Sequence, residues 1–211
     1  MRNYFKIILY LFVLFAFNAA RADATVDFFR AVNVDNDQTI KSLLDSGFDP
    51  NTRNPQGQGA LFLALREESI KVAAALLAHP AIQVDAPTAA DETALMMAAL
   101  RGNVDWIARL LERGAALNRP GWTPLHYAAT GPSMAAVQLL LDRGAQINAA
   151  SPNRSTPLMM AARYGPSEST ELLLARGADA RLRNDKSLSA ADFARSAGRE
   201  SLAATLETAA R

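Results

Sequence analysis

A block of small and apolar residues recurs along the chain, each time ahead of a second apolar run. The clearest copy is Thr123–Ala129, with the sequence TPLHYAA. Threonine is a favoured helix N-cap because its hydroxyl accepts a hydrogen bond from a first-turn amide, and proline fits the first helical position. The second run, residues 135–142, ends before Gly144, which suits the left-handed backbone that follows many helices. The pattern predicts two short helices in each block.

The block returns at a nearly constant spacing. Thr156–Ala162 begins 33 residues after Thr123, and Thr93–Ala99 begins 30 residues before it. Weaker copies begin at Gly59 and Ser189. Because chance does not keep such a register, we expect the chain to consist of repeated helix pairs. The expected pairs are 26–32 with 39–44, 59–66 with 70–78, 93–100 with 104–112, 123–129 with 135–142, 156–164 with 169–175, and 189–196 with 199–208.

Glycines close the second helices at a fixed place in the register. Gly114, Gly144 and Gly177 each follow the threonine of their block by 21 residues. We expect these glycines to take positive φ, which glycine adopts without strain. The one short spacing lacks three residues between Asn118 and Gly121, in a connecting loop where such changes are tolerated.

The repeated unit resembles the ankyrin repeat, whose signature is T-P-L-H-x-A at a period of 33 residues. The resemblance covers nearly all of the chain after residue 22 and implies an all-α solenoid of about six helix–turn–helix units joined by β-hairpin-like loops. We interpret residues 23–211 as one such domain. The units are expected near residues 23–54, 55–88, 89–118, 119–151, 152–184 and 185–211.

Residues 1–22 follow a different pattern. Arg2 and Lys6 precede an apolar run over residues 7–17, and small residues stand at Ala20 and Ala22. This succession predicts a secretory signal peptide that is cleaved after Ala22. The alternative is an uncleaved membrane anchor, although the apolar run is shorter than the roughly 20 residues that span a bilayer. The bacterial character of the segment favours the periplasm, with membrane contact only if the segment is retained.

Composition narrows the classes of partner. The formal net charge is +1 and half of the 211 residues are apolar, which indicates a soluble globular protein and does not favour nucleic-acid binding. The chain has no cysteine, so disulfides cannot stabilise an exported form. Stacking of the repeats has to supply the stability.

The sequence shows no arrangement typical of an active site. The two histidines, His79 and His126, fall in different units, and neither a cysteine nucleophile nor a phosphate-binding or dinucleotide motif is present. His126 stands at the histidine of T-P-L-H, whose role in the family is a structural hydrogen bond to neighbouring backbone. We therefore expect no enzyme, no cofactor and no metal site.

Large apolar side chains in the helices are expected to pack in the core. Trp106 falls in a second helix, at a position where the family places an apolar residue between repeats. Four methionines in the first helices are also interpreted as packing residues, because metal binding through them would need histidine or cysteine partners nearby. They are Met96, Met97, Met159 and Met160.

The resemblance implies a protein-interaction module, and the family makes its contacts through loop tips and the exposed ends of the first helices. Mapped onto this chain, the candidates combine arginines with two aromatic residues, the types enriched in interface hot spots. The candidate partner-binding residues are Arg66, Arg101, Arg119, Trp122, Arg163 and Tyr164. Because Arg66, Arg101 and Arg163 hold nearly equivalent positions, they predict a basic groove suited to an acidic segment of a partner.

Two functions agree with these observations. The first is a periplasmic module that binds one protein partner and protects, inhibits or assists it. The second is a scaffold held at the inner membrane by the retained N-terminal segment. The alternative for the charged helix ends is that they bind no partner and are simply solvated by water.

Overall fold

The computed structural model describes residues 23–211, and the predicted signal peptide lies outside the described residues. The chain divides into two compact units at Gln83. We call residues 23–83 the N-terminal unit and residues 84–211 the C-terminal unit, and describe each by itself. The interpretation of residues 23–211 as one domain stays a prediction.

The N-terminal unit is helical throughout its core. Residues 23–33 form a helix, which is followed by α2 (Asp37–Asp45), α3 (Ala60–Arg66) and α4 (Ile70–Ala78). Asn36 caps α2 by accepting a hydrogen bond from the Thr39 amide at 3.1 Å. Buried side chains from three of these helices, among them Phe28, Ile40 and Leu76, make up the core.

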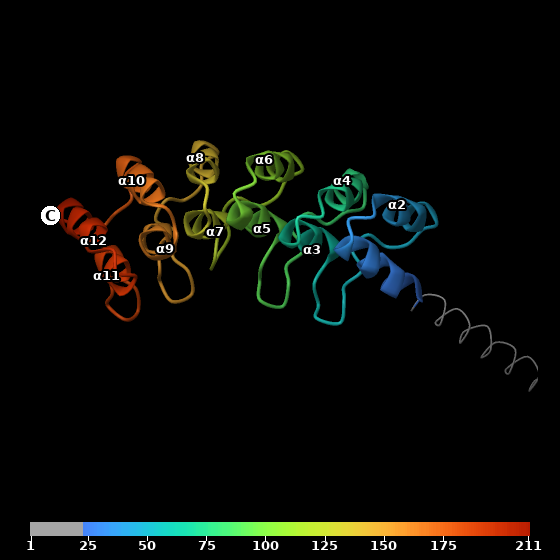
Figure 1. Ribbon diagram of the computed structural model, residues 1–211, viewed down its shortest axis with the longest axis horizontal. Coiled ribbons are helices and arrows are strands. Elements are labelled where there is room, and N and C mark those ends of the chain that lie inside the picture. Colours follow the sequence, from blue (N-terminus) through green and yellow to red (C-terminus); the bar gives the residue numbers. More distant parts are fainter. Residues whose placement is uncertain (1–22) are drawn as a thin grey trace, which may run out of the picture. The chain divides into compact units, whose positions relative to one another are not determined.

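The C-terminal unit consists of four helix pairs in two rows (Figure 1). The pairs are α5 (Ala94–Arg101) with α6 (Val104–Glu112), α7 (Pro124–Thr130) with α8 (Met134–Asp142), α9 (Pro157–Tyr164) with α10 (Ser167–Ala175), and α11 (Ala190–Ser196) with α12 (Glu200–Ala209). In one row α7 packs between α5 and α9, and α9 also packs on α11; in the other row α8 packs between α6 and α10. The predicted all-α solenoid is confirmed.

The helix boundaries follow from the capping residues. Thr93 and Thr156 stand just outside α5 and α9, and their hydroxyls accept from the third helical amide at 3.4 Å. In return, the sulfur of that third residue lies 3.4 Å from the threonine amide. The first helices therefore begin one residue after the predicted start, because the threonine serves as the cap and not as the first helical residue.

The large apolar side chains mostly pack as expected. Trp106 is only 2% exposed, so its predicted position in the core is confirmed. Met96, Met97 and Met159 are also buried. Met160 differs, because it is half-buried and lines a pocket described below. Within residues 23–211, none of the helices combines the length and the apolar character needed to cross a membrane.

The glycines after the second helices have the expected backbone. Gly114, Gly144 and Gly177 have φ values of 86°, 89° and 90°. We expect Gly144→Val to lower the free energy of unfolding by at least ~1 kcal/mol, because a β-branched residue is strained at positive φ. Chemical denaturation monitored by circular dichroism measures the change.

Gly59→Val is the matched control. Gly59 precedes α3 with φ of −79°, and an added Cβ would meet nothing within 4 Å. Valine therefore meets neither a clash nor positive φ there, and its only cost is that it is a poorer N-cap than glycine. Equal denaturation midpoints for the Gly144 and Gly59 variants would show that positive φ does not matter for stability.

Candidate partner-binding site

One connecting loop of the C-terminal unit differs from its neighbours. The loops before α5, α9 and α11 close through a backbone hydrogen bond from their first amide to their fifth carbonyl, at 2.8 to 3.0 Å. These bonds join Thr88 to Glu92, Ser151 to Ser155, and Asn184 to Leu188. The loop before α7 is the one shortened by three residues in the sequence, and it turns at Gly121 with φ of 80°. Figure 1 shows this short loop between the longer loops before α5 and α9.

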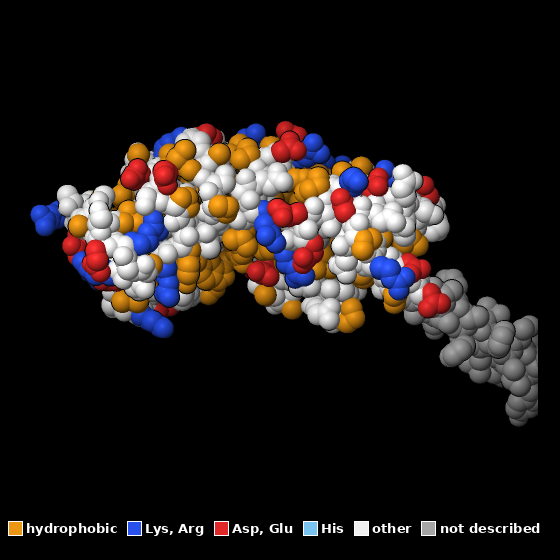
Figure 2. Space-filling view, viewed as in Figure 1, with side chains coloured by type: hydrophobic (Ala, Val, Ile, Leu, Met, Phe, Trp, Pro, Cys, Tyr) orange, Lys and Arg blue, Asp and Glu red, His pale blue; other side chains and the backbone are white. Residues whose placement is uncertain are grey.

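An apolar pocket of about 260 Å³ opens beside the short loop. Its walls come from the short loop and from α5, α7 and α9, three neighbouring helices of the row formed by the first helix of each pair. We call this row the first helix row, and the row that contains α6, α8 and α10 the second helix row. The lining residues are Leu100, Trp122, His126, Tyr127, Thr130 and Met160. Figure 2 shows apolar side chains gathered below α7, between the loops that precede α5 and α9. We call this feature the Trp122 pocket.

His126 fixes one wall of the Trp122 pocket. The Thr123 amide donates to Nδ1 of His126 at 3.2 Å, and the Thr123 hydroxyl lies 2.8 Å from the same nitrogen. Because Nδ1 accepts, the ring proton is on Nε2, which donates to the Ser155 carbonyl at 3.0 Å. The predicted structural hydrogen bond of His126 is thus confirmed. Thr123 and His126 together form a capping box at the start of α7, and the Thr123 hydroxyl also contacts the imidazole.

Trp122 is oriented by this histidine. The indole and imidazole rings meet edge to face, with centroids 5.2 Å apart. His126 is 1% exposed, and burial lowers its pKa from 6.5 to about 4. The neutral imidazole is therefore the form that holds Trp122 at neutral pH. The indole itself is only half-buried, so part of it faces the pocket opening.

Tyr127 forms a second wall of the pocket, and its hydroxyl is hydrogen-bonded to a carboxylate. The Tyr127 hydroxyl donates to Glu92 of the preceding repeat at 3.0 Å. Burial, together with the charge of Glu92, raises the pKa of Tyr127, so the hydroxyl stays protonated and keeps donating. Because the phenol is neutral, this bond leaves the negative charge of Glu92 uncancelled. The neighbouring Asp91 differs, since Arg119 pairs with it at 2.5 Å.

The structure separates the six predicted partner-binding residues into groups. Trp122 lines the pocket, and Arg119 lies nearby in its ion pair with Asp91. Arg163 and Tyr164 are exposed at the end of α9, with the guanidinium over the phenol ring at 5.1 Å.

Two arginines differ from this group, Arg101 in its register and Arg66 in the unit to which it belongs. Arg101 is exposed at the end of α5, eight residues after its threonine, whereas Arg163 lies seven residues after its own. One residue turns a helix by about 100°, so the two side chains leave their helices in different directions. Arg66 belongs to the N-terminal unit, where it pairs with Glu67 at 2.7 Å. Partner binding by the six residues stays a prediction.

Sequence reasoning did not select Tyr127 and Met160 for the site. Both stand four residues after the threonine of their repeats, where Met97 of the preceding repeat is buried. The sequence shows the shortened loop, but a deletion in a connecting loop by itself predicts only that the fold tolerates it. Together, the short loop and a large residue at this position were the signal for a pocket.

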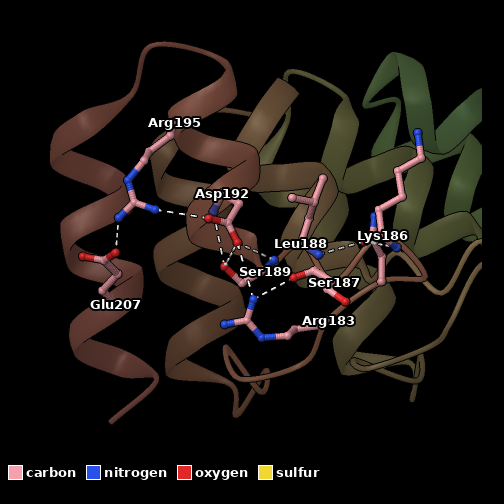
Figure 3. A network of polar contacts seen from close by, with 9 residues as sticks. Arg183, Lys186, Ser187, Leu188, Ser189, Asp192, Arg195 and Glu207 are labelled. Atoms are coloured by element: carbon pink, nitrogen blue, oxygen red, sulfur yellow. Dashed lines mark hydrogen bonds and ion pairs between the residues drawn. The ribbon is translucent and has the colours of Figure 1, made fainter.

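A second, polar pocket of about 410 Å³ lies at the C-terminal end of the chain. Figure 3 shows that its charged side chains point toward one another. Arg195 pairs with Asp192 at 3.2 Å and with Glu207, and Arg183 lies 3.7 Å from Asp192. Asp192 also accepts from the Ser189 hydroxyl and amide, which caps α11. Because these charges neutralise each other, we interpret the network as a structural contact between α11 and α12.

Metal binding finds no support in the described part of the chain. Across residues 23–211, no three or more histidine, aspartate and glutamate side chains are grouped so that they could hold a metal ion. The Trp122 pocket is the better candidate for a functional site, because its walls are apolar and two aromatic rings are accessible there.

Comparison with known proteins agrees with the architecture. A family model described as ankyrin repeats (3 copies) matches residues 28–120 and 116–184. The human transient receptor potential cation channel subfamily A member 1 is 29% identical over 159 residues, which are 70% of this chain and 14% of that protein. The mouse B-cell lymphoma 3 protein homolog is 31% identical over 152 residues, 69% of this chain and 34% of that protein. The chain thus spans about a third or less of the length of these relatives.

A solved structure is similar in fold. It is described as the Bd0816 predatory endopeptidase from Bdellovibrio bacteriovorus in complex with immunity protein Bd3460. The matching chain superposes with a TM-score of 0.73 at 24% identity, over 86% of this chain and 97% of that chain. At this identity the likeness concerns the fold alone.

Proposed function

Since the chain belongs to the ankyrin-repeat family, we propose that it is an exported interaction module which binds one protein partner through the Trp122 pocket and protects, inhibits or assists that partner. Ankyrin repeats imply a protein–protein interaction module, and the family is generally non-enzymatic. The fold does not identify the partner, so the argument for the site rests on its own residues. The proposal assigns no catalytic activity and no cofactor to the chain.

The observation that carries the proposal is the Trp122 pocket itself. Hot spots of protein interfaces are rich in tryptophan, tyrosine and arginine, and they lie in desolvated pockets. Here Trp122 and Tyr127 line one apolar pocket, and Arg163 with Tyr164 is exposed on the adjacent α9. A solved structure of similar fold holds an endopeptidase in complex with an immunity protein, so we include protection or inhibition of a partner enzyme among the forms that this function would take.

Trp122→Ala is the direct test of the site. Capture from an extract of the native host, with the wild-type chain as bait, supplies the partner. If Trp122 is a hot spot, its truncation weakens binding by about 2 kcal/mol or more, which is roughly 30-fold in Kd. Titration calorimetry with the purified partner measures the change, and circular dichroism confirms that the variant folds.

Met134→Ala is the matched control for Trp122→Ala. Met134 begins α8 in the other helix row, and its side chain is 45% exposed. Its truncation removes exposed apolar surface away from the pocket and leaves Kd unchanged. If Trp122→Ala binds like the wild type while Met134→Ala weakens binding, the partner uses the second helix row and the site assignment is wrong.

Arg101→Glu tests the proposed attraction of an acidic segment of the partner. Reversal of one exposed charge at an interface slows association and changes its dependence on salt, with little effect on the fold. Stopped-flow association at two salt concentrations measures both effects. An association rate that is the same for the variant and the wild type at low salt would exclude Arg101 from steering.

The location of the protein is proposed from its N-terminus alone. Export to the periplasm with cleavage after Ala22 makes Asp23 the first residue of the mature chain. Mass spectrometry of the protein from its native host is expected to find that terminus. An intact Met1 in the membrane fraction would instead support the inner-membrane scaffold.

A further inference from the structure

We propose that the Trp122 pocket takes one aromatic side chain from an extended segment of the partner, with a basic residue of that segment beside Glu92 and an acidic residue beside Arg163. This inference rests on the proposed function, since it names the part of the partner that the same site binds. It follows from the size of the pocket, from the rigidity of its walls and from the charges on its two sides.

The volume and chemistry of the pocket suit an aromatic ring. An engineered apolar cavity of about 150 Å³ is large enough to bind benzene. The Trp122 pocket has about 260 Å³ and apolar walls, so a phenyl or phenol ring has room. Trp122 and Tyr127 both line it, and aromatic pairs in offset or edge-to-face contact gain stability beyond the area they bury.

The aromatic walls are held in place before any partner arrives. Trp122 packs against His126, whose ring is bonded at both nitrogens. Tyr127 is held by its bond to Glu92. Walls that are already ordered lose little conformational entropy on binding, which favours the entry of a rigid side chain.

The short loop before α7 gives access to these walls. The loops on both sides, before α5 and before α9, keep their full length and their closing hydrogen bonds. The loop before α7 is therefore shorter than the loops on either side of it (Figure 1), and Trp122 of this short loop lines the pocket. Within the C-terminal unit, the repeats that begin with α5, α9 and α11 have their full-length loop at this place.

Opposite charges flank the pocket along the direction of the first helices. Glu92 precedes its threonine by one residue, and its carboxylate meets Tyr127 on α7. Arg163 follows its threonine by seven residues on α9, with its guanidinium over a neutral ring. Because α7 lies between α5 and α9, two spacings of about 8–10 Å separate the backbones of the two helices. The carboxylate of Glu92 already reaches Tyr127 on α7, which brings it closer to the pocket. Five extended residues span about 13 Å from the first to the last Cα, and long side chains at both ends of such a segment add to its reach.

Synthetic peptides test the inference against the full chain. The ring peptide is acetyl-Gly-Lys-Ala-Phe-Ala-Glu-Gly-amide, which places the ring between the two charges. One comparison peptide has alanine in place of phenylalanine, and the other exchanges lysine with glutamate. Anisotropy of labelled peptides gives each Kd. The ring peptide is expected to bind at least tenfold more tightly than either comparison peptide.

Two variants of the chain separate the contributions of the ring and of the charge. Leu100→Trp fills the pocket and abolishes the preference for phenylalanine over alanine. Glu92→Gln keeps the acceptor for Tyr127 but removes the charge, so it abolishes the preference for lysine near the ring and leaves the preference for the ring intact. Glutamine is nearly the same size as glutamate and keeps the bond to Tyr127, so this variant folds even if Leu100→Trp does not.

Several results would overturn the inference. These are equal binding of the ring and alanine peptides, no binding of the ring peptide at millimolar concentration, or unchanged preferences in Glu92→Gln. If p-cresol alone binds as tightly as the ring peptide, the pocket serves a small aromatic molecule and the peptide segment is wrong. If partner capture depends on Trp122 but the three peptides bind with equal Kd, this inference is wrong and the proposed function still holds. Absence of any captured partner would count against the proposed function alone.

Discussion

Trp106→Ala is expected to lower the free energy of unfolding by about 3–5 kcal/mol, the range found for truncation of buried aromatic residues. The indole is 2% exposed on α6, which packs against both α5 and α8. At the equivalent position of the next repeat, α8 carries Ala136, which is fully buried. A large residue thus stands where its neighbour is small. Alanine at both positions leaves a cavity that the two helices cannot close by shifting side chains alone.

Trp106→Phe is the matched comparison, because it keeps a ring in the same space and loses only part of the volume. Its effect is expected to be clearly smaller than that of the alanine variant. Denaturant titration followed by far-UV circular dichroism measures both effects. Tryptophan fluorescence is less suitable, because the mutation removes one of the two tryptophans. If the alanine variant loses less than about 1 kcal/mol, Trp106 does not hold the repeats together in the way its burial suggests.

Acidification between pH 6.5 and 4 is expected to destabilise the protein through His126. The folded chain keeps the imidazole neutral, because burial lowers its pKa to about 4. In the unfolded chain the histidine binds a proton below its ordinary pKa of 6.5, so the unfolded state gains protons first as the pH falls. Above pH 6.5 both states are neutral and this group gives no pH dependence. Over the window down to pH 4 it removes about 3 kcal/mol.

His126→Met isolates this effect with a residue that the chain already uses. Met96 and Met159 stand at the same position of the neighbouring repeats and offer their sulfur to the threonine amide. Methionine does not titrate, so the variant lacks the loss of stability between pH 6.5 and 4. At pH 7.5 it is less stable than the wild type, because the Ser155 carbonyl loses its partner. Identical pH profiles for the two proteins would contradict the assignment of this effect to His126.

The same titration bears on the binding site. Trp122 packs on the neutral imidazole of His126, and its indole forms part of the pocket wall. A charged imidazole can no longer accept from the Thr123 amide. The order of the pocket and the stability of the C-terminal unit therefore depend on one protonation state.

The helices could be predicted from the sequence because their signals are local. A threonine cap, a small apolar face and a glycine after the second helix lie within one repeat, and each acts on its immediate neighbours. Gly114, Gly144 and Gly177 accordingly took the expected backbone. The buried position of Trp106 followed in the same way, from its place in the register.

The site was less predictable because it depends on contacts between repeats. Trp122 was found from its type and loop position. Tyr127 and Met160 enter the pocket because α7 and α9 stack side by side beneath a missing loop tip. Arg119 is a candidate from its type and loop position alone, and the sequence does not reveal that Asp91 of the preceding loop pairs with it. Such pairings join residues 28 or more positions apart and leave no trace in a repeat pattern.

The repeats of the C-terminal unit share their capping and differ in their accessible residues. The position four residues after the threonine or serine holds Met97, Tyr127, Met160 and Phe193 in successive repeats. The cap keeps each repeat in register, whereas these side chains determine what the surface can bind. A shortened loop in one repeat is enough to turn two of them into the walls of a pocket.

The most direct measurement is hydrogen exchange of the chain with and without its purified partner. Binding through the Trp122 pocket predicts slower exchange of amides in the short loop before α7, in α7 itself and in α9, with little change in α6, α8 and α10. The same experiment with Trp122→Ala is expected to show weaker protection at equal partner concentration. Protection confined to α6, α8 and α10, with α7 and α9 unchanged, would contradict the account.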